Sequence, residues 1–138
     1  RNEIPFMEGK QPYPGRKKAK KLVKSGVSLP LKEAIDGLGL ESMGNLKPYY
    51  TPGHSPGHVV YYHHQDQILI GGDLFSSNSR GLKRPIPIFT ADMKQAILSG
   101  QIVKELKPRL LSICHGFDVP QPHLHYDQFA EKWLPQYS

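Results

Sequence analysis

The sequence has one cysteine and no long apolar run. Cys114 is the only cysteine among 138 residues, so no disulfide can form within the chain. No apolar run approaches the ~18 residues that suggest a membrane span. These absences exclude a fold held together by its own disulfides and give no sign of a membrane-spanning helix. We therefore expect a cytoplasmic protein that has no membrane partner.

The first residues lack the marks of a natural N-terminus. Residues 1–5 contain neither an initiating Met nor the apolar region of a signal peptide. From this we expect the chain to begin inside a longer protein.

Positive charge is concentrated near the start of the chain. The net charge is +6, and residues 16–24 read RKKAKKLVK. Such a run can mark a nucleic-acid-binding surface, but this one has no aromatic residues for base stacking. Its apolar residues fall at helical spacing on one side. We therefore predict a solvated helix and no nucleic-acid partner, with nucleic-acid binding through residues 16–24 as the alternative.

Glycine and proline, 13 of each, divide the sequence into short segments. Strands that alternate with helices favour an α/β fold, and the length fits a single domain over residues 1–138. Asp92 is a suitable N-cap for one of the helices, and Cys114 ends an apolar run in which we expect a buried thiol. The patterns predict strands at 46–51, 59–63, 67–71 and 110–114, helices at 16–25, 93–106 and 126–134, and a long loop at 76–90.

Three residues that could bind metal follow apolar strands. His54 lies in TPGHSPGH, residues 51–58, where prolines and glycines pre-shape the backbone around the imidazole. Asp73 follows the run Ile68–Ile70 after two glycines, and His115 follows the run 110–114. The active sites of α/β sheets lie at the carboxyl ends of strands. One carboxylate and two imidazoles suit zinc, manganese or iron.

These segments carry a family resemblance. TPGHSPGH, ILIGGDLF and ICHG, in this order and at this spacing, are similar to the third, fourth and fifth motifs of the metallo-β-lactamase superfamily. Its members include hydroxyacylglutathione hydrolase, lactonases and β-lactamases. Residues 2–9 also resemble a stretch found midway through many members. The resemblance implies that residues 1–138 form the C-terminal half of an αββα sandwich whose upstream half is absent.

The resemblance also implies a role for each residue. His54 would bind one metal ion, Asp73 would bridge two, and His115 would bind the second. His58, at the start of a strand, is interpreted as a hydrogen-bonded residue that supports the ligands rather than as a ligand itself.

The family's first motif, His-x-His-x-Asp-His, is missing, since residues 1–53 contain no histidine. That motif supplies most ligands of one metal ion and the general-base Asp, which we therefore expect upstream of residue 1. Residues 122–128, PHLHYDQ, mimic the motif. They stand at the wrong end of the chain, just before a predicted helix, and are interpreted as a solvated loop.

The implied activity is hydrolysis of a small-molecule substrate by two divalent metal ions, with zinc favoured and manganese or iron open. A metal-bound hydroxide would attack an ester, thioester, lactone or amide. The alternatives are a nucleic-acid-processing member of the fold and an iron-dependent redox member. Phe75, Arg80 and Lys83 are expected to border the substrate pocket. The chain alone is expected to be incomplete and to need an upstream segment, a second chain or self-association to cover its sheet.

Overall fold

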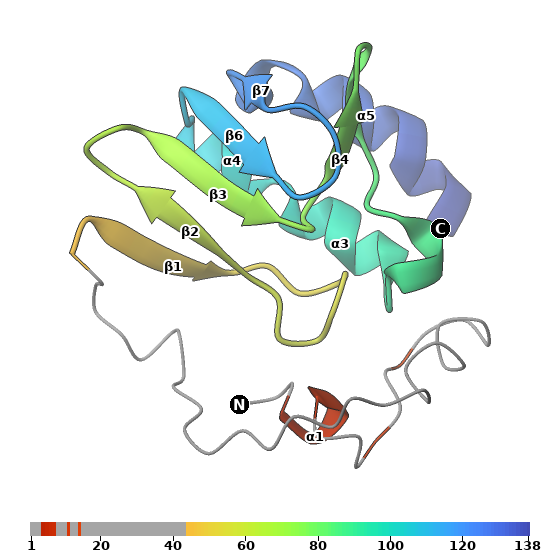
Figure 1. The fold of residues 1–138 in the computed structure, drawn as a ribbon. Coiled ribbons are helices and arrows are strands. Elements are labelled where there is room, and N and C mark those ends of the chain that lie inside the picture. The colour runs from red at the N-terminus through yellow and green to blue at the C-terminus, as the bar shows by residue number, and fades with distance from the viewer. Residues whose placement is uncertain (1–3, 8–10, 12–13, 15–43) are drawn as a thin grey trace.

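The computed structural model describes residues 4–7, 11, 14 and 44–138 (Figure 1). The predicted helix at 16–25, and with it the basic run, lies outside these residues. The described part begins with a short helix, α1 (Ile4–Met7). Within the described ranges, no helix combines the length and the hydropathy that crossing a membrane requires.

A five-stranded sheet forms the centre of the fold, in the order β1-β2-β3-β6-β7. β3 and β6 are parallel, and the other neighbouring pairs are antiparallel. The predicted strands are confirmed to within a residue or two at each end, and β7 is an addition to them. The strands are β1 (Leu46–Tyr50), β2 (Val59–His63), β3 (Ile68–Gly72), β6 (Leu110–Ile113) and β7 (Val119–Pro120).

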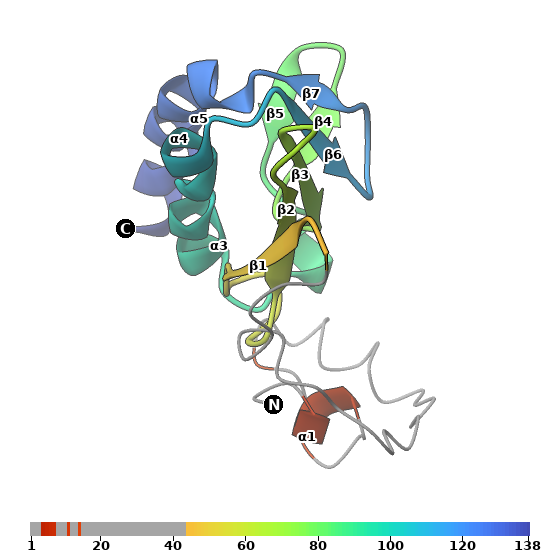
Figure 2. The same cartoon turned by 90° about the vertical axis from the view of Figure 1, so that its left-hand side faces the viewer.

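Three helices cover one face of this sheet (Figure 2). They are α3 (Met93–Ser99), α4 (Ile102–Leu106) and α5 (Tyr126–Trp133). The mixed sheet with its helices confirms the α/β class. The core between the two layers contains fully buried aliphatic residues from both, namely Val60, Leu69, Leu111, Ile97 and Val103.

The helix predicted at 93–106 is two helices. Asp92 caps α3 as expected, because its side chain accepts a hydrogen bond from the backbone N–H of Gln95 at 2.9 Å. The break falls at Gly100, whose backbone lies against the buried ring of Phe75. A Cβ at this position would lie 2.6 Å from the ring, so glycine allows the close approach.

The loop predicted at 76–90 is largely ordered, and that prediction was wrong. It contains a hairpin of β4 (Ser76–Asn78) and β5 (Gly81–Lys83), followed by a 3₁₀ turn at Pro87–Phe89. The strands have three residues each and are mostly polar, so they produce almost no alternating pattern. Buried Leu82 anchors the hairpin to the core.

Two further expectations are corrected. Phe75 is 1% exposed and packs edge-on against Phe129, with ring centroids 5.1 Å apart, so it belongs to the core and not to a pocket wall. Cys114 is exposed rather than buried. The reason is that β6 ends at Ile113, which leaves Cys114 in the bend beyond the sheet.

The sheet face opposite the helices is apolar and partly exposed. Side chains alternate along each strand, so Leu69 points to the helices while Ile70 points away. Ile70 and Tyr50 are each 45% exposed. Tyr61 lies beside Ile70 in the register of β2 and β3, and the two widen the apolar surface.

Candidate metal centre

Three loops meet at one end of the sheet. β1, β3 and β6 run in the same direction, since β2 is antiparallel to β1 and β3 while β6 is parallel to β3. His54 lies in the loop after β1, Asp73 directly follows β3, and His115 comes two residues after β6. The carboxyl ends of these strands therefore bring together residues that are far apart in the sequence.

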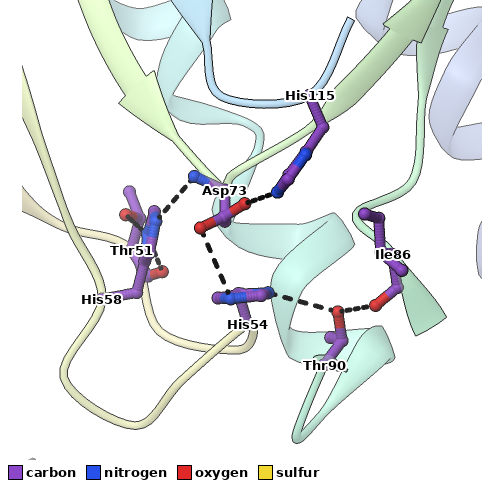
Figure 3. Close-up of polar contacts among 7 residues, drawn as sticks. All are labelled: Thr51, His54, His58, Asp73, Ile86, Thr90 and His115. Carbon is purple, nitrogen blue, oxygen red and sulfur yellow. Dashed lines mark hydrogen bonds and ion pairs between the residues drawn. The ribbon is translucent and has the colours of Figure 1, made fainter. Parts of the chain in front are cut away.

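The Asp73 carboxylate lies between the two imidazoles (Figure 3). Its Oδ2 is 3.6 Å from Nε2 of His54, and its Oδ1 is 3.3 Å from Nε2 of His115. The side chains of Asp73 and His54 are 31% and 19% exposed, and that of His115 is 54% exposed. The three predicted residues thus converge on one point, at the edge of the sheet and within reach of solvent.

These residues form a partial ligand set. Their atoms, two imidazole nitrogens and two carboxylate oxygens, are of the types that zinc, manganese and iron accept. Each imidazole faces a different oxygen of Asp73. In the described part of the chain, however, no group of three or more His, Cys, Asp or Glu residues is arranged to hold a metal ion. The donor chemistry fits, while four-coordinate zinc needs further ligands.

The loop that carries His54 is fastened to the start of α3. The backbone N–H of Asp92 donates to the carbonyl of Gly53 at 2.8 Å, and the N–H of Ala91 donates to that of His54 at 3.0 Å. Gly53 has φ +136°, and a Cβ there would lie 2.1 Å from the backbone nitrogen of Ala96. Only glycine allows this approach, so the glycine before His54 sets where the imidazole sits.

Thr90 orients the imidazole of His54. Its hydroxyl donates to the carbonyl of Ile86 at 2.8 Å, and its Oγ1 lies 3.4 Å from Nδ1 of His54. Because the hydroxyl proton is engaged with Ile86, Oγ1 is left to accept the Nδ1–H. That tautomer directs the Nε2 lone pair towards Asp73, which is how histidine ligands are commonly prepared for a metal.

His58 supports Asp73 through the main chain. Its Nε2 accepts from the backbone N–H of Asp73 at 3.3 Å, so the ring proton belongs on Nδ1. Nδ1 lies 2.9 Å from Oγ1 of Thr51 and 3.2 Å from the Thr51 carbonyl. Both ring nitrogens of His58 are therefore within hydrogen-bond distance of partners, and the ring is tied to the backbone of Asp73.

The remaining histidines of the described residues stand apart from this centre. His63 pairs with Asp66 at 3.1 Å in the turn between β2 and β3, at the opposite end of the strands, and His64 beside it is exposed. His123 and His125 lie in and after the 3₁₀ turn Pro122–Leu124, which precedes α5. Neither belongs to a metal-binding group among the residues described.

Sequence reasoning missed Thr90 and Ser77, which contact His54 and the loop that carries His115. Thr90 precedes the N-cap of α3, and Ser77 lies in the hairpin predicted as loop. Neither has a local signal, because each acts through contacts with residues more than 30 positions away.

Comparisons with known proteins place the chain in a family. Residues 2–115 match the family model of the metallo-beta-lactamase superfamily. The chain is 34% identical over 137 residues to the probable metallo-hydrolase YybB of Bacillus subtilis, a match that covers 98% of this chain and 57% of that protein. The chain therefore spans little more than half the length of this relative.

Solved structures show the same fold. The metallo-beta-lactamase family protein TTHA1429 of Thermus thermophilus matches with a TM-score of 0.56 and 21% identity, covering 97% of this chain and 43% of that one. TTHA1623, crystallised in a di-iron-bound form, matches with a TM-score of 0.57 and 23% identity, covering 88% of this chain and 58% of that one. With most of its length matched by the family model, the chain belongs to the metallo-beta-lactamase superfamily.

Proposed function

We propose that this chain is part of a metal-dependent hydrolase and that His54, Asp73 and His115 are metal ligands. The observation that carries the proposal is the carboxylate of Asp73, which has an imidazole on each of its two oxygens. The relative named as a probable metallo-hydrolase supports the reaction class.

His54 would bind one ion and His115 the other, and Asp73, which lies between the two imidazoles, would be shared by both. Zinc is the first candidate, with manganese and iron as alternatives, and one relative is known in a di-iron-bound form. A bound divalent ion lowers the pKa of water to ~7 and polarises a carbonyl oxygen.

A carbonyl substrate is compatible with this chemistry. We propose a small molecule with an ester, thioester, lactone or amide carbonyl. The role of this chain's own residues is to hold the ligands rigidly: Thr90 sets the tautomer of His54, and His58 fixes the backbone at Asp73. The other ligands and the general-base Asp are proposed to come from an upstream segment.

Replacing Asp73 tests this function. In the intact protein we expect two divalent ions per chain and hydrolysis of a simple thioester or lactone. Asp73→Asn keeps the shape of the side chain but removes the charge shared by the two ions. Replacing a residue that only hydrogen-bonds to a metal ligand lowers metal affinity or activity about 10–100-fold. Replacing the proposed ligand itself should lower them by at least that factor. Metal content by mass spectrometry and turnover of the two substrates are the measurements.

Asp66→Asn is the matched control, because Asp66 is an exposed carboxylate at the opposite end of β3 and also contacts a histidine. It should retain metal and activity. A wild-type protein that binds no divalent metal, or an Asp73→Asn variant with full metal content and turnover, would rule the proposal out.

A further inference from the structure

We infer that Ser77, on β4, is a positioning residue for His115, so that the β4–β5 hairpin is part of the metal centre. This inference rests on the proposed function, because it assigns the hairpin a role at the same site.

Ser77 contacts the His115 loop on both sides of Gly116. Its backbone N–H donates to the carbonyl of His115 at 3.1 Å. Its hydroxyl donates to the carbonyl of Phe117 at 2.6 Å, and its Oγ accepts from the N–H of Phe117 at 2.6 Å. One serine thus makes three hydrogen bonds to a segment about 40 residues further along the chain.

Gly116 brings the two segments into direct contact. Its φ is +126°, and a Cβ built there would lie 2.3 Å from the carbonyl oxygen of Ser77 and 2.5 Å from its Oγ. A side chain at this position would push the loop off β4. The glycine after His115 is therefore required by the same contact that Ser77 makes.

His115 needs support from outside its own strand. β6 ends at Ile113, and the last link between this segment and the sheet is the hydrogen bond from the N–H of Cys114 to the carbonyl of Gly72, at 3.0 Å. The side chain of His115 is 54% exposed. Packing therefore holds it weakly, and the position of its Nε2 depends on where the backbone is held.

The hairpin is well placed to give that support. Leu82 of β5 is buried in the core, and the hydroxyl of Ser76 donates to the carbonyl of Arg84 at 2.7 Å. A rigid neighbouring element keeps a ligand within the small tolerance that binding requires. Ser77 extends this rigidity from the core to His115.

The experiment compares Ser77→Ala with Ser79→Ala in the intact protein. Ser79 is an exposed serine in the turn of the same hairpin. The affinity for Zn²⁺ is measured by competition with a chromophoric chelator, and the coordination geometry is read from the absorption spectrum of the Co²⁺ form. Hydrogen exchange of the Phe117 amide in the metal-free protein reports whether the serine contact itself is present.

For Ser77→Ala we expect Zn²⁺ binding about ten-fold weaker, an altered Co²⁺ spectrum, and faster exchange at Phe117 while core amides such as Leu69 stay protected. Ser79→Ala should match the wild type in all three. Unchanged Zn²⁺ affinity and Co²⁺ spectrum in Ser77→Ala would overturn the inference and leave the proposed function intact. A wild-type protein that binds neither ion would overturn both.

Discussion

Thr51 and Thr90 are the buried polar side chains of the described residues, with 2% and 4% of their surfaces exposed. Each lies within hydrogen-bond distance of a histidine, Thr51 of His58 and Thr90 of His54. Burying a hydroxyl is costly unless it is hydrogen-bonded. At the scale of single residues, these two buried hydroxyls lie where they can orient the imidazoles of His58 and His54 beside Asp73.

Replacing Thr90 with valine tests this alignment. Val keeps the branched shape but removes the acceptor for Nδ1 of His54, so the imidazole is no longer held in one tautomer. We expect Zn²⁺ affinity to fall about ten-fold in Thr90→Val, while Thr90→Ser, which keeps the hydroxyl, stays close to the wild type. Chelator competition measures the affinities, and urea unfolding confirms that Thr90→Val is folded. Equal affinities in the two variants would contradict the role assigned to Thr90.

The convergence of His54, Asp73 and His115 could be predicted from the sequence, and the residues that contact them could not. His54 lies among prolines and glycines, and Asp73 and His115 follow apolar runs, so each has a signal within a few residues. The role of Thr90 arises from a contact with a residue 36 positions away. Cys114 shows the same limit, because its exposure depends on where β6 ends rather than on its apolar neighbours.

At the scale of elements, the loop 51–58 and α3 behave as one unit. The loop hydrogen-bonds to the first residues of α3, and it is joined again where the hydroxyl of Ser99 donates to the carbonyl of Pro52 at 2.7 Å. The sequence predicted both pieces and the N-cap at Asp92. It did not predict their junction, nor the break at Gly100, since both follow from tertiary contacts.

Gly53→Ala tests the junction. The added Cβ would overlap the backbone of Ala96, so the loop or the helix must move. Overpacking of this kind costs about 1–3 kcal/mol, in addition to the strain of a positive φ. Gly81→Ala is the control, because Gly81 also has a positive φ, +101°, but faces open space. We expect urea unfolding to show a larger loss of stability for Gly53→Ala, accompanied by weaker Zn²⁺ binding. Equal losses of stability in the two variants would mean that the close approach of Gly53 to Ala96 does not affect the free energy of unfolding.

At the scale of the whole molecule, the helices among residues 44–138 cover one face of the sheet and leave its other face without a helix from that range (Figure 2). The opposite face presents Ile70, Tyr61 and Tyr50. Burying a large apolar side chain contributes about 1.5–3 kcal/mol to stability. The free energy forgone by leaving several of them exposed is therefore a substantial fraction of a typical net stability of ~5–15 kcal/mol. We propose that an upstream segment, another chain or a second copy covers this face.

Residues 1–138 purified alone should therefore self-associate and bind less than two metal ions per chain. Ile70→Lys places a charge on the uncovered face and should reduce the association measured by sedimentation. Ile88→Lys is the control, because Ile88 is also 45% exposed but lies in the 3₁₀ turn Pro87–Phe89. A stable monomer of the unaltered chain with two metal ions and turnover would contradict this expectation.

The parallel pairing of β3 with β6 also bears on how late the proposed metal ligands come together during folding. Parallel strands need a long crossover, and here the chain from Gly72 to Ile113 passes through the β4–β5 hairpin, α3 and α4 before the two strands meet. The chain must lose the entropy of closing a loop of about 40 residues before the contacts between the two strands can stabilise it. We therefore expect Asp73 and His115 to become neighbours late in folding. An ion that binds both residues would bind the native state and not the partly folded states that precede it. The free energy of unfolding should therefore rise with the concentration of the ion, by mass action.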